Sequence, residues 1–249
     1  MIRANQSVFG PGIALIATTL VGISLSTAIA APKPTLPTPK PSVQPTPAPK
    51  TQPKPQGSSK PSTASIKDTV LVPGEKIGPI TAKSTYEDLV KIFGAESLSD
   101  IRPPDADDTE KEIGTRVNLG PDLSLTLVWH DKTKTKLYEA IDLGPGWKMP
   151  NGLRIGMPMT EIQKILGPFQ MVGLGGPYGG VIPLSETTLK QYYGKIIVQM
   201  APVKDAAKKF PKEYKAVEGE RLIASTDPNW KALGMTVKYL VIVFPRTDT

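Results

Sequence analysis

Residues 31–64 set the strongest limit on how this chain can fold. The segment holds eleven prolines and five lysines among its 34 residues, and it has no acidic residue. A segment of this composition has little apolar surface to bury, and its prolines favour the extended polyproline II conformation. We therefore predict a disordered proline-, lysine- and threonine-rich linker over 31–64, and a folded domain confined to residues 65–249.

The segment before the linker has the three parts of a secretory signal peptide. Arg3 supplies positive charge, an apolar run extends from Gly12 to Ile29, and Ala28 and Ala30 form a cleavage site of small residues. We expect residues 1–30 to be removed on export to the periplasm or the extracellular space. The alternative is an uncleaved anchor, because the run is almost long enough to cross a bilayer of roughly 30 Å. A membrane is an expected partner only in that case.

The linker also accounts for the basic character of the chain. The net charge is +7, but six of the 30 Lys and Arg residues lie before residue 65, which leaves 24 against all 23 acidic residues, or +1. A nearly neutral domain lacks the positive excess that nucleic-acid binding requires, so we expect no nucleic-acid partner. The absence of cysteine excludes disulfides, thiol nucleophiles and cysteine metal ligands.

The domain shows mostly the periodicity of strands. In residues 123–129 a leucine or tryptophan at every second position predicts one core-facing side, and residues 136–141 fit the hairpin partner. Residues 195–200 predict another strand. Residues 235–244 are apolar on both faces, which favours a place inside a sheet. We also expect a helix over 203–210 that ends at Pro211.

Residues 147–180 combine a turn at Asn151-Gly152, a short strand at 153–155, a helix from Pro158 to Gly167 and a glycine-rich loop. Residues 74–94 have a similar order, with Ile77-Gly78 in place of Ile155-Gly156. There we expect a capping box of Ser84 and Glu87, and a buried stripe of Tyr86, Leu89, Val90 and Phe93. The fold class is therefore α+β, with a mainly antiparallel sheet and two or three helices on one face. If the similarity is a duplication, the halves are 70–145 and 147–245.

Two groups of residues are candidates for catalysis or metal binding. His130 is the single histidine and lies at a predicted strand end beside Asp131, which favours a solvated residue over a catalytic base. Carboxylates crowd residues 105–112, namely Asp105, Asp107, Asp108, Glu110 and Glu112. Their spacing is not that of an EF-hand, so a solvated loop is favoured, with calcium binding as the alternative. We expect no catalytic residue, no metal and no cofactor.

The loop from Gly173 to Gly180 is the most unusual local composition of the domain. It lacks the lysine and hydroxyl residue of a phosphate loop, but it can bring backbone close to a partner. Tyr178 offers an amphipathic contact, and Trp147 follows Pro145-Gly146. The binding hypothesis therefore names Trp147, Gly175, Gly176, Tyr178 and Gly179; the alternative is that the aromatic residues fill the core at turns.

Several of these residues together resemble an uncharacterised family of exported bacterial domains. They are residues 73–81 with the helix to Gly94, Trp147, residues 152–157, Tyr178-Gly179-Gly180 and residues 225–228, so the resemblance spans most of 70–244. The loop departs from the family pattern Gly-Phe-Gly-Trp-Asp-Tyr-Gly-Gly, because its other aromatic and acidic positions are missing. The order of Ile-Gly turn, helix and antiparallel sheet is also similar to the β-lactamase inhibitory protein and the outer-membrane assembly lipoprotein BamE.

Those two proteins bind partners and are not catalysts, so the resemblance implies a non-enzymatic binding or envelope-assembly module. The expected partner is an envelope protein or a glycan. Two alternatives remain: a periplasmic hydrolase that uses His130 or the carboxylates of 105–112, and a membrane-tethered spacer protein.

Overall fold

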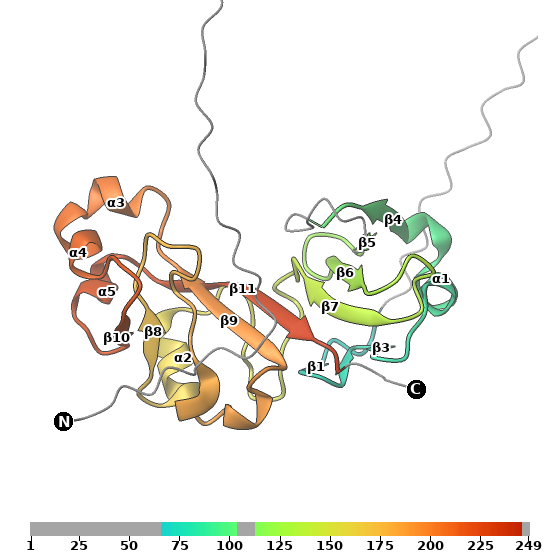
Figure 1. Cartoon of the computed structure of the whole chain (residues 1–249), viewed down its shortest axis with the longest axis horizontal. Coiled ribbons are helices and arrows are strands. Elements are labelled where there is room, and N and C mark those ends of the chain that lie inside the picture. Colours follow the sequence, from blue (N-terminus) through green and yellow to red (C-terminus); the bar gives the residue numbers. More distant parts are fainter. Residues whose placement is uncertain (1–65, 104–112, 246–249) are drawn as a thin grey trace, which may run out of the picture. The chain divides into compact units, whose positions relative to one another are not determined.

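The computed structural model describes residues 66–103 and 113–245 (Figure 1). The predicted signal peptide, the linker and the acidic residues between Asp105 and Glu112 lie outside the described residues. Within them, the protein is an α+β domain with three sheets, and the predicted fold class is confirmed. None of the described helices is long and apolar enough to cross a bilayer.

The N-terminal part of the domain contains a small sheet, one helix and four longer strands. The small sheet has the order β1-β2-β3, and all its pairings are antiparallel. The elements are β1 (Leu71–Val72), β2 (Lys76–Ile77), β3 (Ile80–Thr81), α1 (Tyr86–Phe93), the 3₁₀ helix η1 (Ala95–Ser97), β4 (Leu98–Ile101), β5 (Ile113–Val117), β6 (Leu125–Trp129) and β7 (Leu137–Ile141).

The C-terminal part adds a helix, a two-stranded sheet, two long strands and three short helices. Its elements are α2 (Met159–Leu166), β8 (Gln170–Val172), the 3₁₀ helices η2 (Leu184–Glu186) and η3 (Lys190–Tyr192), β9 (Ile196–Ala201), α3 (Ala206–Lys209), α4 (Pro211–Ala216), β10 (Leu222–Ala224), α5 (Asn229–Ala232) and β11 (Thr236–Val243). β8 pairs with β10 in the two-stranded sheet.

A six-stranded antiparallel sheet connects the two parts, in the order β4-β5-β6-β7-β11-β9. β11 lies between β7 and β9, where Ile242 pairs with both Ala140 and Ile196 (Figure 1). The prediction that residues 235–244 lie inside a sheet is confirmed, as is the hairpin of β6 and β7. Since β11 completes the sheet begun by β4 to β7, the predicted halves share one sheet.

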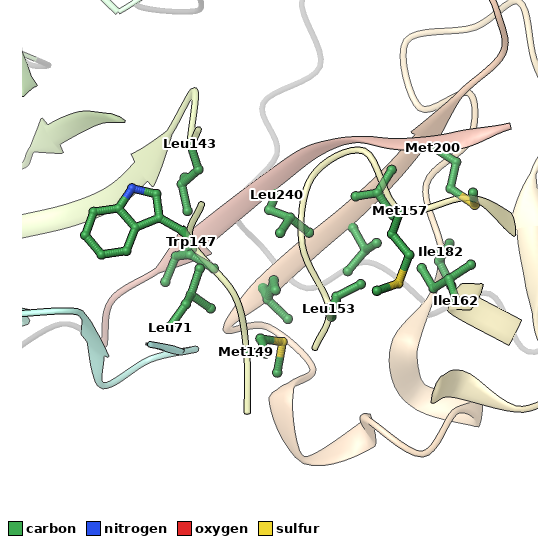
Figure 2. Close-up of a cluster of buried hydrophobic side chains, with 14 of the residues drawn as sticks. Leu71, Leu143, Trp147, Met149, Leu153, Met157, Ile162, Ile182, Met200 and Leu240 are labelled. Carbon is green, nitrogen blue, oxygen red and sulfur yellow. The ribbon is translucent and has the colours of Figure 1, made fainter. Parts of the chain in front are cut away.

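A single apolar core extends through both parts of the domain. Figure 2 shows a section of it, in which Leu240 of β11 is drawn between two groups of side chains. One group is Leu71, Leu143 and Trp147, and the other is Met157, Ile162, Ile182 and Met200. The first group comes from residues 71–147 and the second from residues 157–200, and both belong to one cluster of buried side chains.

The two eight-residue helices end alike but begin differently. α1 and α2 both stop at a glycine with positive φ, 80° at Gly94 and 75° at Gly167. α1 begins with a capping box of Thr85 and Asp88, so the predicted box of Ser84 and Glu87 is wrong by one residue. The Ser84 hydroxyl instead accepts a hydrogen bond from the backbone N–H of Thr81 at 3.0 Å.

Three other local predictions need correction. In β6 both faces are buried, so the alternation of residues 123–129 does not divide core from solvent. Residues 153–155 form no strand, although Leu153 is fully buried. Pro211 begins α4 instead of only ending α3, because proline lacks the N–H that a first helical turn leaves unused.

The described chain has five α-helices where two or three were expected. In the predicted stripe of α1, Leu89 and Phe93 are buried, whereas Tyr86 and Val90 are half-buried.

Candidate binding surface

Trp147 belongs to the core and offers no surface to a partner. Its side chain is 0% exposed, and its indole N–H donates a hydrogen bond to the carbonyl oxygen of Leu123 at 2.9 Å. The ring also lies against Gly78, where a Cβ atom would approach it to 2.8 Å. The structure thus removes Trp147 from the predicted binding residues, because the indole fills the space next to the Ile77-Gly78 turn.

The loop from Gly173 to Gly180 is fixed by backbone hydrogen bonds at both ends. At the start of the loop, the N–H groups of Gly173 and Leu174 donate to the carbonyl oxygens of Arg221 and Val217. At its end, the N–H of Gly180 donates to the carbonyl oxygen of Val172, and the carbonyl oxygen of Gly180 accepts the N–H of Met200. Two glycines are sterically required. A Cβ on Gly180, where φ is +80°, would overlap the carbonyl oxygen of Met200, and one on Gly173 would overlap that of Gly219. Much of the glycine content therefore follows from close packing of the backbone.

The middle of this loop is accessible. Gly175 and Pro177 are exposed, and the other predicted binding residues of the loop, Gly176, Tyr178 and Gly179, are half-buried. They stay together on one short turn, in which Gly179 N–H donates to the carbonyl of Gly176 at 3.0 Å. The geometry leaves this turn able to contact a partner, and the binding hypothesis for these four residues stays a prediction.

His130 and Asp131 lie where β6 leads into the β6–β7 loop. His130 follows the last residue of β6 and is half-buried instead of solvated, with its Nε2 removed from solvent and its ring centroid 4.5 Å from that of Tyr138. The Asp131 carboxylate accepts hydrogen bonds from the backbone N–H groups of Thr135 and Lys136, at 3.3 and 2.9 Å. It thus holds the β6–β7 loop. Burial raises the pKa of Asp131, but these bonds and the Thr133 hydroxyl outweigh it and keep the pKa below its ordinary value.

One face of β9 and β11 carries apolar side chains into solvent. Ile197 pairs directly with Val241, and Gln199 with Tyr239. Directly paired residues project to the same side of an antiparallel sheet, so these four form one block. Tyr239 is 47% exposed and Ile197 40%, while their strand neighbours Val198 and Leu240 are buried on the other side. We call the block of Ile197, Gln199, Tyr239 and Val241 the Tyr239 face.

A β-bulge at Lys238 aims Tyr239 outward. Val237 pairs with Met200 and Tyr239 with Gln199, so one extra residue, Lys238, lies between the β11 positions, whereas the β9 positions are adjacent. In a regular strand Tyr239 would share the buried side of Val237. The extra residue reverses this, and both Lys238 and Tyr239 become exposed. Lys238 Nζ lies 5.8 Å from the Tyr239 ring centroid.

The glycine loop lies at the edge of the Tyr239 face. The side-chain amide of Gln199 donates a hydrogen bond to the carbonyl oxygen of Gly179 at 2.8 Å, and Val181 forms a bridge with Gln199. The bridge covers the outer edge of β9. Because Gln199 belongs to both features, the loop and the Tyr239 face are neighbouring parts of one surface.

The residues of the Tyr239 face are not among the predicted site residues. For 235–244 the sequence predicts only a strand that is apolar on both faces and lies inside a sheet. The signal in the sequence is the pair Lys238-Tyr239 and the polar Gln199 within otherwise aliphatic strands. No group of three or more His, Cys, Asp or Glu residues able to hold a metal ion occurs among residues 66–103 and 113–245.

Comparison of the chain with family profiles, with characterised proteins and with solved structures finds no match in any of the three.

Proposed function

We propose that this chain is a non-enzymatic, exported binding or envelope-assembly module, and that the Tyr239 face together with the Gly173–Gly180 loop is its recognition surface. The observation that supports this most is the outward orientation of Tyr239 by the bulge at Lys238. Bulges are frequent where a strand must re-aim a functional side chain.

The size of the exposed tyrosine gives an expected effect. A tyrosine buries roughly 150–250 Å² when it is covered, so about 100 Å² of Tyr239 remains for a partner. At about 25 cal/mol per Å² this area contributes roughly 2–3 kcal/mol, which is roughly a 30- to 150-fold change in affinity. Tyrosine is also among the residues enriched at the energetic centres of interfaces.

The alternative of a periplasmic hydrolase depends on His130 and the carboxylates of 105–112. Asp131, the acidic neighbour of His130, is committed to its own loop, and the other carboxylates lie outside the described residues. A membrane-tethered spacer depends on residues 1–30 alone. The described domain supports the binding proposal with an exposed surface.

Affinity capture tests the proposal. The full chain, Tyr239→Ser and Leu222→Ser are immobilised and presented with envelope extract and with purified cell wall. Leu222 is a matched control, because it is 49% exposed and lies on β10 in a different sheet. We expect Tyr239→Ser to lose a partner that the full chain and Leu222→Ser retain. Equal capture by all three proteins would overturn the proposal, and a Tyr178→Ser variant measures the contribution of the loop.

A further inference from the structure

We propose that the partner of the Tyr239 face is a polypeptide segment whose apolar side chains are flanked by carboxylates. The inference rests on the proposed binding function and adds the chemistry of the partner. The face has an apolar centre, two exposed lysines at its rim and one amide side chain whose nitrogen is already bonded.

The centre of the face suits apolar side chains. Ile197, Val241 and the Tyr239 ring form three of its four positions, and Val243 continues the same side of β11 with a half-buried side chain. Protein interfaces commonly have such an apolar centre with a polar rim. Aliphatic side chains bind other apolar side chains more favourably than sugar hydroxyls. A hydroxyl covered by this face would lose its hydrogen bonds to water and find no replacement.

The rim of the face is positively charged. Lys238 and Lys195 are exposed, and Lys195 precedes β9 where its carbonyl accepts the N–H of Val243. Neither lysine forms an ion pair with any residue that the structure describes. β9 and β11 contain no Asp or Glu. Glu139 of β7 pairs with Val243 and therefore projects to the same side of the sheet, but it is half-buried and already has an interaction of its own, so the two exposed lysines outweigh it. Carboxylates on a partner would complement this rim.

A glycan fits the face less well. Sugar recognition needs several polar groups that are ready to bind hydroxyls. The amide nitrogen of Gln199 already donates to Gly179, which leaves its oxygen and the Tyr239 hydroxyl as the polar groups of the four-residue face. The proline-rich segment of the same chain is also a poor occupant. It carries five lysines and no acidic residue, so it would place like charges beside Lys195 and Lys238.

Selection from a displayed library of random twelve-residue peptides tests the inference. The full chain serves as bait, and clones that also bind Tyr239→Ser are discarded. We expect the remaining clones to combine aromatic or aliphatic residues with an excess of Asp and Glu over Lys and Arg. A peptide synthesised from such a clone should bind Lys238→Glu roughly 3- to 10-fold more weakly than the unchanged chain, and more weakly at high salt.

Lys212→Glu is the charge-matched control, because Lys212 is an exposed lysine on α4, and it should change the affinity less than about 2-fold. Tyr239-dependent peptides that are neutral or basic, or a Lys238→Glu variant that binds as tightly as the unchanged chain, would overturn the inference. The same holds if an oligosaccharide array yields the only Tyr239-dependent ligands, although the proposed function would then stand. If neither peptides nor oligosaccharides depend on Tyr239, both proposals fail.

Discussion

Tyr239 on β11 lies directly opposite Gln199 on β9, and the amide of Gln199 holds the carbonyl of Gly179 at 2.8 Å. This relationship connects the long central strand with the glycine loop that is most conspicuous in the sequence. The glycine loop and the strand face have different roles. The loop keeps its shape through close backbone contacts, whereas the strand face presents side chains.

The structural requirement for glycine in the loop can be measured. Gly180→Ala should lower the free energy of unfolding by roughly 2–5 kcal/mol, because it adds overlap with Met200 to an unfavourable positive φ. Gly156 has a similar φ of +83° and open space around it, so Gly156→Ala should cost only about 1–2 kcal/mol. Urea denaturation compares the two, and equal losses would contradict the packing found at Gly180.

Trp147 should act on stability. Trp147→Ala is expected to cost roughly 3–5 kcal/mol through the cavity it leaves, and Trp147→Phe less, because the ring is retained while the bond to Leu123 is lost. Thermal unfolding of both variants gives the comparison. A Trp147→Ala variant with unchanged stability would contradict the burial of the indole in the core.

The start of α1 distinguishes two adjacent capping boxes. Thr85→Ala should cost about 1 kcal/mol, because the Thr85 hydroxyl accepts the N–H of Asp88. Glu87 is exposed and takes no part in the observed cap, so Glu87→Ala should change stability by less than about 0.5 kcal/mol. If denaturation midpoints show Glu87→Ala to be the more damaging change, the cap lies one residue earlier.

The same cap makes stability depend on pH. The N–H of Thr85, then its hydroxyl and the Lys91 ammonium, hold the pKa of Asp88 below its ordinary value. Because this pKa is lower in the folded chain than in the unfolded chain, the stabilisation is complete above about pH 4 and is lost as the pH falls through the lowered value. Between pH 6 and pH 3 the unchanged protein should therefore lose more stability than Asp88→Asn. Identical losses would show that the carboxylate contributes nothing.

The sequence predicts the strands better than the details that create the surface. Residues 235–244 have apolar residues on both faces, and this pattern correctly indicates a strand with neighbours on both sides. It cannot indicate the bulge, because an extra residue at Lys238 becomes visible only in the register with Met200 and Gln199. The cap was misplaced for a similar reason, since Ser84 and Thr85 are each followed three residues later by an acidic residue.

Long-range contacts explain the remaining differences. The glycines at 173 and 180 face carbonyl groups of Gly219 and Met200, which are distant in the sequence. Trp147 is flanked by turn residues, yet it is covered by residues from β1 and from the segment before β6. Local patterns carry no information on such approaches, so a glycine-rich loop and an aromatic residue at a turn had the same appearance as an exposed site.

The proposed recognition surface places Tyr239 in direct contact with the partner. Incorporation of a photoreactive phenylalanine analogue at position 239, in the cells that produce the protein, tests this directly, with the same analogue at position 222 as the control. We expect a crosslinked product from position 239 and none from position 222. Crosslinking from 222 alone, from both positions equally, or from neither would contradict it.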